Sequence, residues 1–405
     1  MRIAIVGPVH PYKGGIPLHT TELANRLQAA GHETRVVSWR SQYPGFLYPG
    51  EQRVPGAEPE LVLETPVEAP LTWYNPFGWW RAGRKLRGSD LVVVTYFVPY
   101  FQGTSGLVLA RALGRGSRRP GRSGRPRVAA LCHNVLQHDP HPGDRLLTRL
   151  FLSRVDSVIV HTDAQAALAR SFTAKPVRTV AMAPHLPASA RVGAPAPAPA
   201  GAGTLGAAGS DPAGSDPPGL KRRLLFFGLV REYKGVDVLL RALAQVPDVA
   251  LIIAGEARVG ARIDALIDEL GLRGRVEFSG QYVPAAAIPG LFAAADALVL
   301  PYRSGTATQN VDVGFAQGVP VIATRVGSMG DRIRPDVDGL LCRPDDVASL
   351  ADAIRHFYQP GVAERLRSGV PRDSADAAWD AYLAVVTQAA DLTRTAEAAR
   401  TGQTG

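Results

Sequence analysis

Arg231 and Lys234 lie three residues apart in the stretch LLFFGLVREYKG, and residues of these types at this spacing could bind phosphate. The stretch predicts an apolar strand over Leu224–Phe227, a turn at Gly228 and a helix that begins near Gly235. The first N–H groups of a helix carry partial positive charge, while arginine and lysine add full charges and donors. The pattern is typical of a site for a pair of phosphates, with two solvated cations at a loop end as the alternative.

A histidine follows another predicted strand in the first half of the chain. Val128–Leu131 is the strand, and His133 comes just after it, where parallel α/β sheets collect ligand-binding residues. His138 and His141 continue the pattern as H-x4-H-x2-H, so a zinc site is an alternative. A structural histidine held by hydrogen bonds is a further alternative for His133.

The chain opens with a strand, a glycine-rich loop, a helix and a second strand. The strands are predicted over Arg2–Val6 and Thr34–Trp39, and the helix over 17–30. This order is typical of a doubly wound α/β sheet. Gly14 and Gly15 come too late after the first strand for the dinucleotide fingerprint. Their N–H groups could still approach an anion at the helix start, or the pair could form a plain turn.

The length, composition and net charge of the chain limit the classes of protein to which it could belong. A chain of 405 residues predicts two domains, and 46% apolar residues are typical of globular proteins. We identify no signal peptide and no membrane-spanning run, and two distant cysteines, Cys132 and Cys342, favour a reducing cytoplasm. The net charge of +9 indicates an anionic partner, such as nucleotide phosphates, a membrane surface or nucleic acid.

Two basic segments of the first half raise the question of a membrane. Residues 41–70 are rich in loop signals, and a helix is then predicted over Pro76–Leu86, where tryptophans stand beside arginines. The preferred interpretation is that Trp79 or Trp80 packs this helix onto the sheet. Residues 111–127 carry seven arginines among glycines and prolines, which indicates a solvated loop that could meet lipid headgroups. Its lack of aromatic residues disfavours nucleic acid.

The second half repeats the alternation of strands and helices. We predict a first Rossmann-like domain over 1–191, a low-complexity linker over 192–219 and a second Rossmann-like domain over 220–372. A helix over 373–392, which contains Trp379, and a disordered tail over 393–405 follow. The fold class is therefore α/β, with a cleft expected between two doubly wound domains.

The motifs, taken in order, resemble the GT-B glycosyltransferases of the large retaining family four over nearly the whole chain. The motifs that carry the resemblance are GGIPLHTTELANRL, LCHNV, FFGLVREYKGVDVLLRAL, LIIAGE, VEFSGQYV, ADALVLPYRSGTATQ, FAQGVPVIATRVGSMGD and DVDGLLCRPDD. The resemblance implies that Arg231 and Lys234 bind the donor diphosphate and that His133 lies near the donor sugar. It also implies that the last helix crosses back onto the first domain.

The resemblance further implies a set of donor-binding residues. Gly14 and Gly15 would approach the phosphate, and 281–283 would hold the base, partly through backbone. The predicted donor-binding residues are Gly14, Gly15, Gly228, Arg231, Lys234, Glu256, Tyr282, Val283, Thr306, Thr308 and Asp312.

The chain departs from the family pattern at one place. Many members carry two glutamates eight positions apart, and the matching positions here hold Gly305 and Val313. Asp312 could replace the carboxylate that contacts the ribose, although one residue is about 100° around a helix. Thr306 and Thr308 resemble a variant of this loop in which hydroxyls hold the phosphate.

The resemblance implies a metal-independent, retaining transfer of a hexose from a UDP- or GDP-sugar to a glycan or lipid-linked acceptor, as in synthesis of cell-envelope polysaccharide. No further cofactor is expected, and His133, Arg231 and Lys234 would serve the reaction. The expected location is cytoplasmic, with peripheral contact to the inner face of the membrane as an option. The alternatives are a non-catalytic protein that binds nucleotide sugars, and a GT-B epimerase or phosphorylase.

Overall fold

The computed structural model describes residues 1–42, 53, 63–97, 106, 126–136, 141–184, 222–257, 260–305, 308–327, 329–371 and 375–390. The chain divides into two compact units. Unit 1 holds Met1–His185 and Ser374–Gly405, and unit 2 holds Leu186–Asp373. The predicted linker 192–219, most of the arginine-rich segment 111–127 and the predicted tail 393–405 lie outside the described residues.

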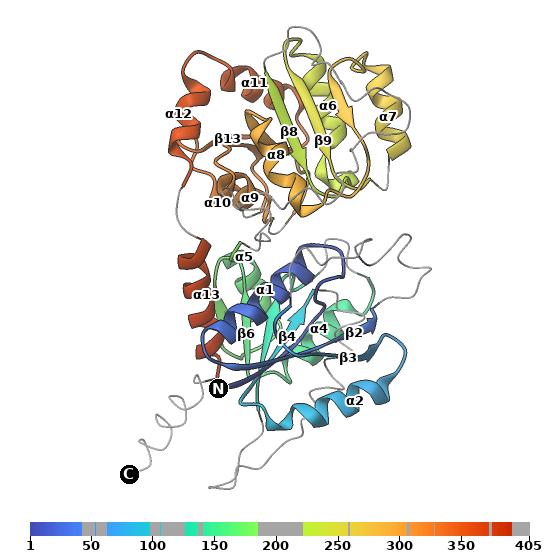
Figure 1. Ribbon diagram of the computed structural model, residues 1–405, viewed down its shortest axis with the longest axis vertical. Coiled ribbons are helices and arrows are strands. Elements are labelled where there is room, and N and C mark those ends of the chain that lie inside the picture. Colours follow the sequence, from blue (N-terminus) through green and yellow to red (C-terminus); the bar gives the residue numbers. More distant parts are fainter. Residues whose placement is uncertain are drawn as a thin grey trace. The chain divides into compact units, whose positions relative to one another are not determined.

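Unit 1 is built on a parallel sheet in the order β3-β2-β1-β4-β5-β6-β7 (Figure 1). Its strands are β1 (Arg2–Val6), β2 (Glu33–Ser41), β3 (Val67–Thr72), β4 (Leu91–Tyr96), β5 (Arg127–Cys132), β6 (Ser157–Val160) and β7 (Val177–Thr179). Every residue of β4 is buried, as expected for a central strand with both faces covered.

The described helices of unit 1 are α1 (Gly15–Ala29), α2 (Pro76–Lys85), η1 (Leu86–Gly88), α4 (Asp144–Leu152), α5 (Asp163–Arg170) and α13 (Ala375–Gln388). The predicted start of α2 is confirmed, because Asn75 Oδ1 accepts hydrogen bonds from Phe77 N and Gly78 N. Trp79 is buried and Trp80 is 40% exposed. Of the two tryptophans predicted to pack this helix onto the sheet, Trp79 is therefore the buried one.

The prediction that residues 41–70 are rich in loops missed a strand at the end of this range. Val67–Thr72 forms β3, which pairs with β2 at the edge of the sheet. The first four residues of β3 are exposed, so the apolar alternation that marks a half-buried strand is missing there. Pro70 suits an edge strand, since proline has no N–H to donate to a further strand.

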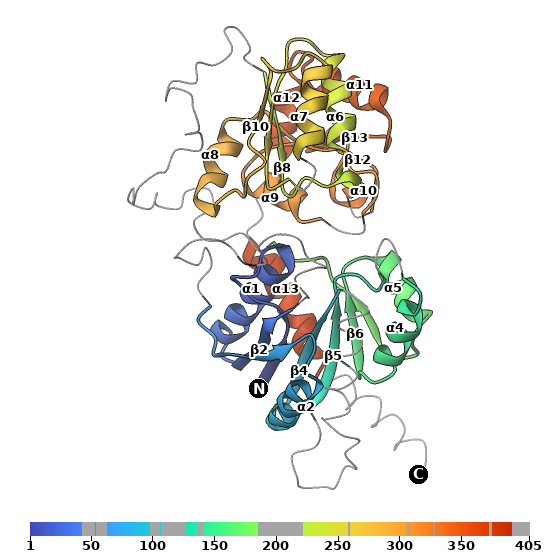
Figure 2. The ribbon, with the colours of Figure 1, turned by 90° about the vertical axis from the view of Figure 1, so that its right-hand side faces the viewer.

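The C-terminal helix α13 belongs to unit 1 and packs along α1 (Figures 1 and 2). Trp379 is fully buried, and its Nε1 donates a hydrogen bond to the carbonyl oxygen of Pro184 at 2.7 Å. Arg26 of α1 lies over the Trp379 ring, 5.3 Å from its centroid, and forms an ion pair with Asp376. Apolar, cation–π and charged contacts therefore all tie α13 to unit 1.

Unit 2 is built on a parallel sheet in the order β10-β9-β8-β11-β12-β13. Its strands are β8 (Arg223–Phe227), β9 (Ala250–Ala254), β10 (Val276–Phe278), β11 (Ala297–Leu300), β12 (Val321–Thr324) and β13 (Gly339–Cys342). Its described helices are η4 (Glu232–Lys234), α6 (Val236–Ala244), α7 (Gly260–Glu269), η5 (Ala285–Ala287), α8 (Ile288–Ala293), α9 (Asn310–Ala316), α10 (Met329–Arg332), α11 (Val347–Phe357) and α12 (Val362–Gly369).

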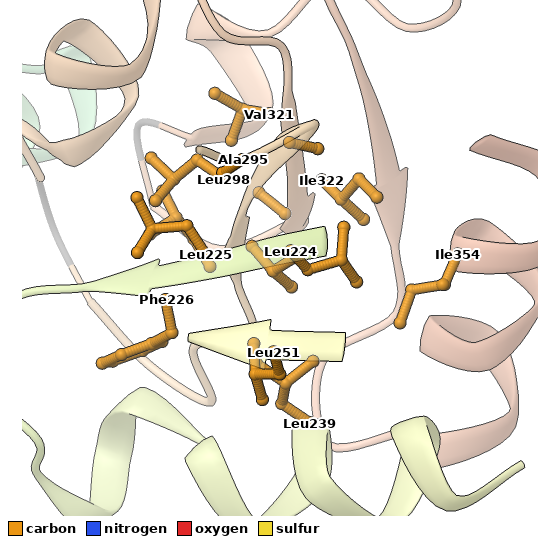
Figure 3. Packing of buried hydrophobic residues seen from close by; sticks show 14 of the residues in the cluster. Leu224, Leu225, Phe226, Leu239, Leu251, Ala295, Leu298, Val321, Ile322 and Ile354 are labelled. Carbon is orange, nitrogen blue, oxygen red and sulfur yellow. The ribbon is translucent and has the colours of Figure 1, made fainter. Parts of the chain in front are cut away.

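The core of unit 2 surrounds β8. Figure 3 shows the side chains of this strand among those of α6, β9 and β11, including Leu224, Leu239, Leu251 and Leu298. In each sheet, the two strands that follow the first strand in sequence extend the sheet on one side of it. The later strands extend the sheet on the other side. The strand order therefore reverses between β1 and β4 and between β8 and β11, which is where open α/β sheets bind ligands.

The prediction of two parallel α/β domains of Rossmann-like type is confirmed. The cleft expected between them stays a prediction. Among the described residues, no helix is both long enough and apolar enough to cross a membrane.

Candidate functional site

The turn after β8 brings Gly228 close to Lys234. Gly228 has φ +110°, and a Cβ atom at this position would lie 3.2 Å from Lys234 Nζ. Its N–H donates to the carbonyl oxygen of Ala254 at the end of β9. At Gly235, the N-cap of α6, a Cβ would collide with the carbonyl oxygen of Pro301. The two glycines therefore let the chain turn back tightly against the ends of β9 and β11.

A polar network ties β8, β11 and α9 together beneath this turn. Asn310 Nδ2 donates to the carbonyl oxygen of Phe227 at 2.6 Å and to the hydroxyl of Tyr302 at 3.1 Å. Burial raises the pKa of Tyr302 to about 12, although hydrogen bonds from Thr308 and Asn310 oppose the shift. Lys234 Nζ lies over the Tyr302 ring, 5.1 Å from its centroid. The ammonium of Lys234 is therefore positioned by a rigid, buried ring.

Arg303 fixes the same turn from the end of β11. Its Nη1 and Nη2 donate to the two carboxylate oxygens of Asp237, at 2.8 and 2.7 Å, and Nη1 also donates to the carbonyl oxygen of Glu232. Its Nε donates to Asp345. Asp237 lies in the first turn of α6, so the positive end of that helix already has an internal carboxylate.

Arg231 and Lys234 differ from Arg303 in their partners. Among the described residues, no carboxylate forms an ion pair with either of them, whereas Arg303 pairs with two carboxylates. Burial lowers the pKa of Lys234, Tyr233 opposes this shift, and the nearby positive charge of Arg231 adds to it. Two cations that repel each other in a half-buried turn favour an anion beside them.

Asp312, in the first turn of α9, is paired within the fold. It forms an ion pair with Arg332 of α10, and its side chain is 10% exposed. Burial lowers the pKa of the Arg332 guanidinium. The predicted replacement for the ribose carboxylate is therefore engaged by an arginine in this structure.

The remaining predicted donor-binding residues of unit 2 lie around the ends of β9 and β10. The carbonyl oxygen of Glu256 accepts a hydrogen bond from Val230 N, which joins this residue to the turn after β8. Tyr282 and Val283 follow β10 and are half-buried, and Val283 packs against the core. Thr306 lies outside the described residues.

In unit 1, Gly14 and Gly15 form the exposed start of α1. Gly14 has φ +115° and is the N-cap, and Gly15 is the first helical residue. The first turn of α1 holds no acidic side chain. The opening of a 15-residue helix therefore presents its N–H groups without an internal carboxylate at its start.

His133 follows β5 and is buried in a group of histidine rings. His133 Nδ1 lies 3.2 Å from His161 Nε2, and the ring of His19 lies edge-on to His133 at 5.2 Å. Trp379 and Tyr382 of α13 pack against His19, with ring centroids 5.3 and 5.0 Å away. The described residues contain no group of three or more His, Cys, Asp or Glu side chains placed to hold a metal ion. His138 of the zinc alternative lies outside them.

Two family models match the chain, one in each unit. The model described as Glycosyltransferase Family 4 matches residues 13–182, and the model described as Glycosyl transferases group 1 matches residues 221–359. Together the two matches cover most of the chain.

The chain belongs to the family 4 glycosyltransferases.

Curated relatives of this glycosyltransferase include the D-inositol 3-phosphate glycosyltransferases of Mycobacterium bovis and Mycobacterium tuberculosis. Each is 32% identical over 171 residues, which are 40% of this chain and 35% of the relative. The matched part therefore spans about a third of the length of these relatives.

Solved structures resemble the glycosyltransferase over almost its whole length. Sucrose-phosphate synthase from Thermosynechococcus elongatus has a TM-score of 0.69 at 19% identity and covers 98% of this chain and 100% of its own. Anabaena HepE in complex with UDP has a TM-score of 0.68 at 18% identity, with the same coverage. At these identities the likeness shows the fold, which is GT-B.

The structure of the glycosyltransferase brings some predicted residues together and adds others. Gly228, Lys234 and Thr308 meet around the Tyr302 ring and Asn310. Tyr302 and Asn310 were not predicted, although they lie within or just after the motif ADALVLPYRSGTATQ. The partnership of His133 with His161 was also missed, because no local pattern links residues 28 positions apart.

Proposed function

We propose that the glycosyltransferase transfers a hexose, with retention, from a nucleotide-diphosphate sugar to a glycan or lipid-linked acceptor. The observation that carries the proposal is the turn after β8. There Arg231 and Lys234, without carboxylate partners among the described residues, lie at the reversal of strand order in unit 2.

The proposed chemistry is electrostatic. As the bond to the sugar breaks, negative charge develops on the departing nucleoside diphosphate. Cations held in place before the reaction stabilise that charge without reorganising. Arg231 supplies a planar fork of donors, and Lys234 supplies a compact charge above the Tyr302 ring. These two charges would serve the leaving group without a metal.

Similar proteins support the donor class. HepE has been solved with UDP and with UDP-glucose, which are ligands of that protein. The mycobacterial relatives are named for an inositol phosphate acceptor. For this chain we propose a UDP- or GDP-hexose donor and an acceptor used in cell-envelope polysaccharide synthesis.

The proposal is tested by transfer assays with a panel of UDP- and GDP-hexoses. We expect Arg231→Ala and Lys234→Ala each to lower turnover at least about a hundredfold, the cost of removing one donor to a developing charge. Arg273→Ala is the matched control, because it removes one positive charge that is exposed and paired with Asp264 and Asp268. Equal activity of all three variants would exclude the phosphate-binding role.

A second candidate function is a nucleotide-sugar-binding protein without catalysis. Gly305 and Val313 occupy the positions of the family's glutamates, and Asp312 is paired with Arg332. Calorimetric titration with UDP-glucose, followed by product analysis, separates the two candidates. Binding without any product or hydrolysis, over a broad acceptor panel, would favour the binding protein.

We also propose peripheral contact with an anionic membrane through one face of α2. Phe77 is 79% exposed and Trp80 is 40% exposed, and Arg81 and Arg84 are exposed beside them. Spacings of three, four and seven residues place all four side chains on one helix face. Aromatic rings next to arginines are typical of a helix that lies at the surface of an anionic bilayer.

A further inference from the structure

The carboxyl ends of three neighbouring strands of unit 1 bring His133, His161 and Val180 into a row. The last paired residues of β5, β6 and β7 are in register, so the next residue of each strand lies beside its neighbour. His133 follows β5, His161 follows β6, and Val180 follows β7. The backbone of the parallel sheet therefore creates this adjacency before any side chain adjusts.

The hydrogen bonds along the row have a fixed direction. His161 Nδ1 lies 3.2 Å from the carbonyl oxygen of Val180, which can accept but cannot donate. The proton of a neutral His161 ring is therefore on Nδ1, and its Nε2 is an acceptor. His133 Nδ1 lies 3.2 Å from that Nε2, so His133 Nδ1 carries the proton of this second bond.

The surroundings of the row favour the neutral form of His161. Burial lowers its pKa to about 4. The rings of His19 and Tyr382 lie 6.1 and 6.0 Å from it, and Tyr382 is fully buried with a pKa raised well above its ordinary value. In such a dry environment a hydrogen bond is stronger than in water, so the two bonds hold a single arrangement of protons.

We propose that His161 is a positioning residue that fixes the tautomer of His133, with the proton on Nδ1 and a lone pair on Nε2. Resting on the proposed function, the transfer reaction requires His133 in this one tautomer.

The tautomer can be measured without any activity. The full-length protein, labelled with ¹⁵N in its histidine rings, is studied by long-range ¹H–¹⁵N correlation at about pH 7, where unperturbed histidine is mostly neutral. A His133→Gln variant identifies the His133 signals by their loss. In the wild type we expect His133 to be protonated at Nδ1 alone. Protonation of His133 at Nε2 alone, or at both nitrogens, would overturn the proposal.

Three variants separate positioning from packing. His161→Phe removes both hydrogen bonds, and we expect His133 to become a mixture of tautomers. His161→Gln keeps an acceptor for His133 Nδ1–H, so it should keep the wild-type tautomer. This variant also tests the proposal if His161→Phe does not fold. Tyr382→Phe is the matched control in the same cluster and should leave the tautomer unchanged. An unaltered tautomer in a folded His161→Phe protein contradicts the proposal.

Kinetic measurements then test whether the tautomer of His133 affects sugar transfer. Where UDP-hexose is turned over, we expect His161→Phe to lower kcat/KM about tenfold, the loss of one good hydrogen bond, and His161→Gln to restore most of it. An unchanged kcat/KM in a folded His161→Phe protein would show that the reaction does not depend on this tautomer. If no nucleotide sugar is turned over, the proposed function fails, while the tautomer result still decides the role of His161.

Discussion

Arg303 binds Asp237 through two parallel hydrogen bonds, from Nη1 to Oδ1 at 2.8 Å and from Nη2 to Oδ2 at 2.7 Å. Arg303 follows β11 and Asp237 lies in the first turn of α6, 66 positions earlier in the chain. A backbone hydrogen bond joins the same two segments, because Arg303 N donates to the carbonyl oxygen of Tyr233 at 2.7 Å. The pair holds the turn that carries Arg231 and Lys234 against the end of β11.

Replacing Arg303 by lysine tests this pair. Arg303→Lys keeps the charge but loses the planar fork, so we expect the free energy of unfolding of unit 2 to fall by about 1–3 kcal/mol. Urea titration followed by hydrogen exchange of residues 232–237 measures the loss. Arg273→Lys, in an exposed ion-pair group, is the control and should change stability little. Equal effects of the two variants would exclude a structural role for the fork.

The acid stability of unit 2 should depend on Asp237. Burial raises the pKa of this carboxyl, but hydrogen bonds and charge from Arg303 and Arg241 lower it more, so its pKa lies below the ordinary value of 3.8. A carboxyl with a depressed pKa stabilises the fold fully above the unfolded value, and this stabilisation is lost as pH falls through the folded value.

We therefore expect Asp237→Asn to destabilise the protein at neutral pH and to flatten the loss of stability between about pH 5 and pH 2. Chemical denaturation across this range, followed by circular dichroism, measures how the free energy of unfolding changes with pH in the variant and in the wild type. Parallel pH profiles for the variant and the wild type would show that Asp237 does not contribute to the acid transition.

Gly228 should be required for both backbone shape and ligand binding. In Gly228→Ala the left-handed φ costs about 1–2 kcal/mol, and the new Cβ lies 3.0 Å from Asn310 Nδ2 and 3.2 Å from Lys234 Nζ. Gly143→Ala is the matched control, since Gly143 has φ +96° with no atom within 4 Å of the added Cβ. We expect both variants to lower the melting temperature, and Gly228→Ala alone to weaken binding of UDP in calorimetry.

The exposed face of α2 should bind anionic vesicles. Phe77→Asp and Trp80→Asp place a charge on this face, so co-sedimentation with phosphatidylglycerol vesicles should fall several-fold, and binding of the wild type should weaken with salt. Leu146→Asp, at a 59% exposed position on α4, is the control for adding a charge to unit 1. Vesicle binding that is equally weakened in the control, or absent in the wild type, would exclude this surface.

Much of the fold could be predicted from local patterns. β8 and its glycine turn, the cap of α2 by Asn75 and the two series of parallel strands all follow from apolar runs and from residues with strong positional preferences. β3 was missed because an edge strand with four exposed residues lacks the apolar signal. Trp79 and Trp80 could not be told apart, because the buried face of a helix depends on what packs against it.

The sequence by itself determined which residues follow the strands, because strand propensity, glycine turns and cation spacing are local properties of the chain. Arg231, Lys234 and His133 were found in this way. The tertiary structure alone decided their partners: Tyr302 under Lys234, Arg332 beside Asp312 and His161 beside His133. These pairs depend on strand order and register, which arise when distant segments pack into one sheet and which no local pattern encodes.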